Sequence, residues 1–222
     1  MTETTVQQGP QRVRMWFDPT CPWAWMTSRW LGEVAETRGF DVDWQVMSLA
    51  VLNEGRDLSE GYAALMPRSM RLTRLVTAAR AAGGDAVVKP LYDALGERIH
   101  HQERRDLDAI VTESLAEVGL DAALAEETDA HDATLRETHQ SAIDLVGDEV
   151  GTPVIAVGDV AFFGPVVSPA PTGADALQLF DGIVAAASID GFFELKRTRT
   201  RGPQFATDAA SSEPAAAQEA SA

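Results

Sequence analysis

The chain has 222 residues, 45% of them hydrophobic and 23% charged, which is enough to bury a substantial core in one elaborated domain or two closely packed ones. Its 34 Asp and Glu residues outnumber 18 Lys and Arg residues, and the formal net charge of -16 repels phosphate backbones and anionic lipid surfaces. Nucleic acid and membrane are therefore not expected as partners. The N-terminus lacks the basic and apolar regions of a secretory signal, so we expect a cytoplasmic protein.

The first predicted elements form a strand, a helix and a second strand. Residues 12–18 (RVRMWFD) alternate apolar and polar side chains, which predicts a strand with one buried face. From Trp23 onward apolar residues recur at spacings of three and four, which predicts a helix that ends at Gly39. Residues 42–49 (VDWQVMSL) predict a second strand, and such a βαβ unit favours parallel strands.

The remaining sequence predicts a helical block and then a hairpin with a last helix. Residues 59–148 contain only helix-favouring segments, whereas two β-rich runs flank Gly158-Asp159 in GTPVIAVGDVAFFGP, and GADALQLFDGIVAAAS follows as a helix. This order predicts an α/β domain interrupted by a helical insertion. The boundaries that we expect are a disordered N-terminus at 1–11, the α/β domain at 12–58 and 149–205, the helical lid at 59–148, and a disordered tail at 206–222.

Cys21 is the single cysteine of the chain and is the candidate catalytic residue. It lies just before the predicted helix, and Pro22 suits the first helical position. Unpaired backbone N–H groups and the helix dipole favour the thiolate there, so the sequence predicts a nucleophilic thiol with a lowered pKa. The alternative is a small buried hydrophobic side chain, which is what most free cysteines are.

Thr152-Pro153 is a second candidate element, because it precedes the β-rich run VIAV. On its own it reads as an ordinary proline at the start of a strand. When it is considered together with Cys21-Pro22-Trp23, a functional role for this element becomes the favoured interpretation.

Several sequence blocks together resemble a known family. These blocks are MWFDPTCPWAWMTSRW, VMSLAVLNEGRD, GERIHHQ, DEVGTPVIAVGDVAFFGPVVS and FFELKRTR, spread over residues 12–205. Their order resembles the DsbA-like branch of the thioredoxin fold, and more narrowly the mycothiol-dependent nitroreductase family. The resemblance implies a thioredoxin-like (DsbA-type) α/β fold with a large helical insertion, and a thiol-disulfide oxidoreductase that uses mycothiol as co-substrate. It also implies that the Thr152-Pro153 bond is cis and that its backbone lies beside Cys21.

The resemblance also implies a set of residues that bind substrate or thiol, namely Pro22, Trp23, Asn53, Tyr62, Thr152 and Pro153. Three of these have a plain alternative: Trp23 can be a core residue, Asn53 a turn residue, and Tyr62 a packing residue of the insertion. The family's best-known pattern has a second cysteine where this chain has Ala24. Because exchange always proceeds through a mixed disulfide, Cys21 then needs an external thiol to resolve it, which is a monothiol cycle.

The other polar motifs are interpreted as structural. His100 and His101 close a helical segment and can cap it, while His131 and His139 lack the spacing of a zinc site, so no metal is expected. The basic run in residues 192–203 is interpreted as a solvated helix end, with Arg197 or Arg199 able to meet a carboxylate. No dinucleotide-binding fingerprint is present.

Three functions remain open from the sequence. The first is a thiol oxidoreductase that reduces disulfides or nitro compounds, with a small thiol and a disulfide or electrophile as partners. The second is a thiol transferase or isomerase like the kappa-class glutathione transferases and hydroxychromene carboxylate isomerases, in which the site activates a bound thiol. The third is a binding or chaperone-like module whose helical lid supplies an apolar groove. Whether the chain forms a homodimer is also open.

Overall fold

The computed structural model describes residues 12–126 and 128–205. The disorder predicted for residues 1–11 and 206–222 concerns residues outside these ranges. The elements are β1 (Val13–Phe17), α1 (Pro22–Arg38), β2 (Val42–Val46), α2 (Leu49–Leu52), α3 (Glu60–Ala63), α4 (Met66–Gly83), η1 (Asp85–Val87), α5 (Val88–Gly96), η2 (Glu97–His101), α6 (Leu107–Glu117), η3 (Ala122–Ala125), α7 (Asp132–Val146), β3 (Val154–Val157), β4 (Val160–Phe163) and α8 (Gly173–Ala187).

The strands form one sheet in the order β2-β1-β3-β4. β1 and β2 are parallel, with Val13 opposite Val42, which confirms the predicted βαβ opening. β3 runs antiparallel to both β1 and β4, and the predicted hairpin turns at Gly158, whose positive φ of 64° suits glycine. The interruption between β2 and β3 carries helices only, as far as residues 59–126 and 128–148 describe it.

The prediction that β1 buries one face is wrong, because β1 is a central strand covered on both sides. Met15 and Phe17 are buried on one face, and Trp16 on the other is equally buried, with its Nε1 donating to Ser141 Oγ of α7 at 3.1 Å. Alternate residues of a strand point to opposite faces, so α7 covers the face opposite Phe17.

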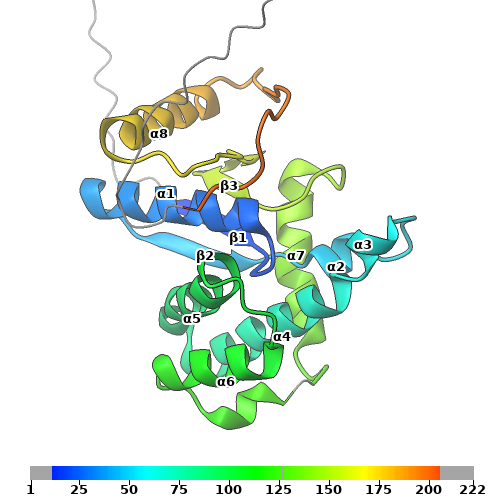
Figure 1. Ribbon diagram of the computed structural model, residues 1–222. Helices are drawn as coiled ribbons and strands as arrows, with labels where there is room; N and C mark the ends of the chain where they lie inside the picture. The colour runs from blue at the N-terminus through cyan, green and yellow to red at the C-terminus, as the bar shows by residue number, and fades with distance from the viewer. Residues whose placement is uncertain (1–11, 127, 206–222) are drawn as a thin grey trace, which may run out of the picture.

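The Phe17 face is covered by α1 and α5. Phe17 stacks on Tyr92 of α5 at a centroid distance of 3.8 Å, and Trp25 of α1 meets the same ring edge-on at 5.5 Å. α8 lies beside α1, where Trp30 Nε1 donates to the Ala176 carbonyl at 2.9 Å. Figure 1 shows the result, with α1 and α8 grouped around the sheet and α4, α5 and α6 gathered below it.

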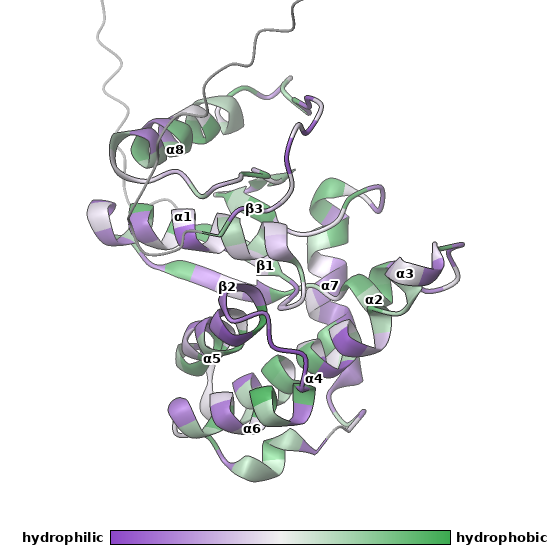
Figure 2. Cartoon of the chain, viewed as in Figure 1, coloured by the Kyte–Doolittle hydropathy of each residue, from purple (hydrophilic) through white to green (hydrophobic). Residues whose placement is uncertain are grey.

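The helical insertion therefore packs on the α/β unit at the end where α1 begins. Figure 2 shows hydrophobic and hydrophilic residues interspersed along α4, α5 and α6, and the apolar residues Leu72, Leu91 and Ile110 of these helices are buried. No helix within the described residues is long and apolar enough to cross a membrane.

Candidate active site

Cys21 is the N-cap of α1, so the strand-turn-helix prediction holds at residue level. Its side chain accepts a hydrogen bond from the Ala24 N–H at 3.4 Å, and Pro22 occupies the first turn. At the far end, Gly39 caps the helix in the left-handed conformation with φ 69°, which glycine adopts without penalty. Ala24 is fully buried, so the position of the absent second cysteine lies inside the core.

Thr152 and Pro153 lie against Cys21, as the family resemblance implied. The Thr152-Pro153 bond is cis, and the Cys21 thiol donates to the Thr152 carbonyl at 3.3 Å. The Thr152 hydroxyl is buried and has no hydrogen-bond partner among the described residues. A buried donor without a partner next to a sulfur is suited to receive a ligand that reaches that sulfur.

The prediction of a lowered Cys21 pKa is wrong for this structure. Burial raises the pKa of the Cys21 thiol, and the nearby Asp18 charge raises it further, although the contact with Thr152 and the Ala24 N–H lower it. The side chain is only 6% exposed. The helix N-terminus is present as the sequence indicated, but desolvation of the sulfur outweighs it.

Asp18 is a site residue that the sequence analysis missed. Its buried carboxylate accepts hydrogen bonds from the Thr20 N–H at 2.8 Å, the Leu49 N–H at 2.8 Å and the Ser69 hydroxyl. Burial raises the Asp18 pKa, and these donors oppose that rise. Asp18 therefore ties the turn before Cys21 to α2 and to α4 of the insertion. An Asp at the end of a strand and two residues before Thr is an Asx-turn signal that could have revealed it.

Asn53 and Tyr62 lie on the insertion side of the same site. Asn53 caps α2, and its Nδ2 donates to the Leu49 carbonyl at 2.7 Å. Burial raises the pKa of the Tyr62 hydroxyl, a hydrogen bond with Asn53 lowers it, and the charge of Cys21 raises it. Tyr62 is 38% exposed. The structure thus pairs Asn53 with Tyr62 and leaves Tyr62 within the electrostatic influence of Cys21, and a role of either residue in binding stays a prediction of the resemblance.

His100 and His101 do more than close a helix. They belong to the π-helical turn η2, and His100 Nε2 donates to the carbonyl of Pro19, two residues before Cys21, at 2.9 Å. Burial lowers the His100 pKa to about 4, so the ring is neutral at pH 7. The ring also stacks on Trp25 at 5.6 Å. π-helical turns occur often at functional sites, a signal that only coordinates provide.

The basic run after α8 returns to the site instead of ending in solvent, and we call residues 192–205 the C-terminal strap. The strap begins at Phe192, whose ring contacts the Phe162 ring edge-on at a centroid distance of 5.6 Å. Further along, the Arg199 guanidinium lies 4.9 Å from the Trp23 ring centroid. At its end, Phe205 stacks on His100 at 5.7 Å. Figure 1 shows this segment descending from the end of α8 toward α1. Trp23, which is half-buried, therefore lies beneath the strap.

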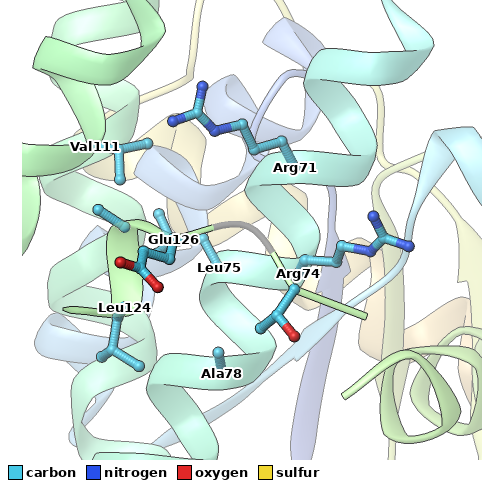
Figure 3. Close-up of a pocket in the computed structure, with 9 residues that line it drawn as sticks. Arg71, Arg74, Leu75, Ala78, Val111, Leu124 and Glu126 are labelled. Atoms are coloured by element: carbon cyan, nitrogen blue, oxygen red, sulfur yellow. The ribbon is translucent and has the colours of Figure 1, made fainter. Parts of the chain in front are cut away.

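A separate pocket in the insertion does not contain any of these residues. Figure 3 shows it against α4, from which Arg71, Arg74, Leu75 and Ala78 project, with Leu124 and Glu126 on the facing segment. Arg71 pairs with Asp108 at 2.6 Å and Arg74 with Asp132 at 2.7 Å, so both cations already have carboxylate partners. This pocket gives no sign of chemistry.

The remaining histidines do not assemble a metal centre in the part of the chain that the structure describes. His139 is buried, and burial lowers its pKa, while His131 caps the start of α7. Among residues 12–126 and 128–205, no three His, Cys, Asp or Glu side chains gather as metal ligands would.

The site geometry can be compared with known proteins. The model of the Rv2466c-like family, described as mycothiol-dependent nitroreductase Rv2466c, matches residues 20–197. The chain belongs to this family. The resemblance seen in the sequence is thus confirmed, and the matched region begins at the turn that carries Cys21 and ends in the C-terminal strap.

Relatives outside the family model support the same fold. An uncharacterised protein of Mycobacterium tuberculosis (strain ATCC 25618 / H37Rv), Rv2286c, is 29% identical over 83% of this chain and 80% of its own. A 2-hydroxychromene-2-carboxylate isomerase structure has a TM-score of 0.52 at 16% identity, over 78% of this chain and 94% of that one. A probable DsbA oxidoreductase from Streptomyces coelicolor has a TM-score of 0.51 at 19% identity, over 86% and 94%. The fold is a DsbA-like thioredoxin fold with a helical insertion.

Proposed function

We propose that this protein is a mycothiol-dependent thiol oxidoreductase in which Cys21 works as a single thiol. The observation that carries the proposal is the pairing of Cys21 with the cis Thr152-Pro153 bond, at 3.3 Å from sulfur to carbonyl, without a second cysteine in the chain. Membership of a family described as mycothiol-dependent nitroreductases supports mycothiol as the small thiol.

The reaction begins when the Cys21 thiolate attacks one sulfur of a substrate disulfide. The new bond joins Cys21 Sγ to that sulfur, the old S–S bond breaks, and the second sulfur leaves with the electron pair as a thiolate. Mycothiol thiolate then attacks the mixed disulfide and releases Cys21. When the substrate is already mycothiolated, one mycothiol is consumed and mycothiol disulfide is formed. Ala24 cannot compete for this step, so the external thiol sets the rate of resolution.

The same electron supply can serve a nitro compound. Two mycothiol molecules give two electrons and two protons as they form mycothiol disulfide, which converts a nitro group to a nitroso group and water. In this exchange Cys21 and the first mycothiol would give up the two electrons and two protons as their mixed disulfide forms, and the thiolate of the second mycothiol would then attack that disulfide, release Cys21 and leave mycothiol disulfide.

The surrounding residues support the cycle. Thr152 offers the incoming thiol a buried hydroxyl that has no hydrogen-bond partner among the described residues, while Pro22 and Ala24 fix the sulfur at the helix start. Trp23, Asn53 and Tyr62 form the wall of the substrate pocket. Because the sulfur is buried, the helical insertion has to move aside as a lid for substrate to enter, with Tyr62 at its edge.

The decisive experiment compares wild type with Cys21→Ser. After exposure to oxidised mycothiol, the intact mass of the wild type should increase by one mycothiol, and free mycothiol should remove the adduct. Cys21→Ser should lose both the adduct and the reduction of a mycothiolated disulfide. A serine variant with full activity on the same substrate would instead support a transferase or isomerase that activates a bound thiol.

Lid movement has its own readout. Hydrogen exchange of α3, α4 and α5 should slow when mycothiol disulfide saturates the site, whereas α8 serves as the internal reference. Equal exchange in both states would show that the insertion is a fixed scaffold.

A further inference from the structure

Two arginines near Cys21 lack the carboxylate partners that most arginines of this protein have. Ion pairs join Arg12 to Asp43, Arg38 to Asp181, Arg104 to Glu113 and Arg136 to Glu54. No ion pair with an Asp or Glu of residues 12–126 or 128–205 involves Arg68 or Arg199. In a chain of net charge -16, cations without partners near a reactive sulfur call for an explanation.

Arg68 approaches the Cys21 turn from the insertion. It lies in the first turn of α4 and is half-buried; its Nε is buried without a hydrogen-bond partner among the described residues, and its Nη2 donates to the Arg104 carbonyl at 3.5 Å. Its neighbour Ser69 donates to Asp18. Burial lowers the Arg68 pKa, and its charge acts on His100. A partly desolvated guanidinium with an unused buried donor is suited to bind an anion.

Arg199 approaches the same turn from the other end of the chain. Its guanidinium lies over the Trp23 ring, two residues after Cys21, and this stacking holds the cation near the sulfur while leaving its N–H groups exposed to solvent. Trp23 itself presents a flat apolar surface. An oxyanion held by the exposed N–H groups of Arg199 would lie beside the Trp23 ring, whose apolar surface suits the body of an aromatic substrate.

We propose that Arg68 and Arg199 form an anion-recognition site beside Cys21, and that the substrate attacked by Cys21 is a planar molecule bearing a carboxylate. The proposal rests on the proposed function in taking Cys21 as the reacting group. The two cations would draw an acidic substrate through the otherwise repulsive field of the protein and orient it on the sulfur.

The test uses two aromatic disulfides with the native single cysteine as reporter. The anionic probe is 5,5′-dithiobis(2-nitrobenzoate), and the neutral probe is 4,4′-dithiodipyridine. Each forms a mixed disulfide with Cys21 Sγ as its own S–S bond breaks, and the aromatic thiolate that leaves absorbs light. The ratio of the two rate constants, anionic over neutral, cancels changes in thiol pKa and burial because both reagents meet the same sulfur.

In the variants, this ratio should fall by about threefold for Arg68→Gln or Arg199→Gln alone and by about tenfold for the double variant. Two matched controls each remove one charge from a residue outside the proposed site. Arg105→Gln changes a residue next to Arg104, whose carbonyl Arg68 contacts, and Arg197→Gln changes a residue of the strap. The controls should keep the ratio within about twofold of wild type, since only screened long-range charge changes. Added benzoate should slow the anionic probe more than inorganic phosphate at equal ionic strength.

An unchanged ratio in the double variant, or an equal fall in the controls, would overturn the proposal. Stronger protection by phosphate than by benzoate would overturn the carboxylate assignment. If Arg68→Gln fails to fold, Arg199→Gln in the exposed strap decides by itself, because an unchanged ratio there contradicts the shared site. Failure of the mycothiol experiment with Cys21→Ser would leave these ratios interpretable, so the two proposals can fail separately.

Discussion

The turn that leads into Cys21 and the strap that lies over Trp23 differ in how deeply they are buried and how firmly they are held. In the turn, Asp18 is buried and holds several donors, and His100 holds the Pro19 carbonyl at 2.9 Å. In the strap, Phe193 is 83% exposed and Leu195 is 89% exposed. The Cys21 sulfur is therefore fixed by a buried network, whereas Arg199, one of the two arginines that we propose for substrate recognition, lies on a lightly anchored segment.

This difference accords with the separate demands of chemistry and recognition. In the proposed cycle the sulfur needs a fixed geometry relative to Thr152, which buried hydrogen bonds supply. A cation that meets ligands from solvent gains from exposure and a short tether, and the strap is tied down through Ser168, whose hydroxyl donates to the Gly202 carbonyl at 2.8 Å. If this contrast holds, substitutions in the turn should lower stability far more than substitutions in the strap.

Asp18→Ala should give the largest effect. The substitution leaves the buried Leu49 N–H and the Ser69 hydroxyl without their acceptor, so the free energy of unfolding should fall by about 4 kcal/mol in urea denaturation. Asp41→Ala, at an exposed carboxylate outside the network, should change it by less than about 0.5 kcal/mol. Similar losses in the two variants would show that the turn owes little to Asp18.

His100 should make stability depend on pH between about 6.5 and 4. The unfolded chain takes up a proton on this ring near pH 6.5, whereas burial lowers the folded pKa to about 4. Protons therefore favour the unfolded chain in this window, and stability that is fully present above pH 6.5 is lost as the pH falls, by about 3 kcal/mol for this group.

The matched variant for this prediction is His100→Gln, whose amide can still donate to the Pro19 carbonyl but does not titrate. Urea denaturation at pH 7.5 and 4.5 should show a smaller loss in the variant than in the wild type. The same loss in both would assign the pH dependence to other groups, such as His139.

Gly96→Ala should lower stability by disturbing the contact between the insertion and α1, the helix that Cys21 caps. A Cβ at Gly96 would lie 2.1 Å from Cζ3 of Trp25, a rigid ring inside the core, so we expect a loss of about 2 kcal/mol. Gly182→Ala is the matched control, because nothing lies within 4 Å of its Cβ on α8, and there alanine should stabilise by about 0.5–1 kcal/mol. Thermal unfolding that moves in the same direction for both would contradict the close contact.

Arg199→Gln should give the smallest change in stability. The exposed cation–π contact with Trp23 contributes less than about 1 kcal/mol, so the unfolding midpoint should scarcely move. A loss comparable to that of Asp18→Ala would mean that the strap is part of the structural core, and the contrast between the two segments would disappear.

Sequence reasoning succeeded wherever a local pattern carried the information. Pro22 at the helix start, Gly39 at its end and the turn at Gly158 each depend on neighbouring residues only, and all were predicted at or near their observed positions. It failed at Trp16, because alternation cannot tell a central strand from one with an exposed face. It also failed on the strap, since nothing in residues 192–203 indicates that the chain turns back toward Trp23.

The sequence by itself determined that a lone thiol caps a helix after a buried strand, and the family resemblance added the partners Thr152 and Pro153. Only the tertiary structure decided how that thiol behaves. Its burial raises the pKa that the helix start would lower, and the groups responsible come from distant parts of the chain: Thr152 lies 131 residues after Cys21, and His100 lies 81 residues after Pro19. Local signals fix backbone conformation through steric and hydrogen-bonding preferences. Desolvation and charge depend on which distant segments pack around a group, and no short stretch of sequence contains that information.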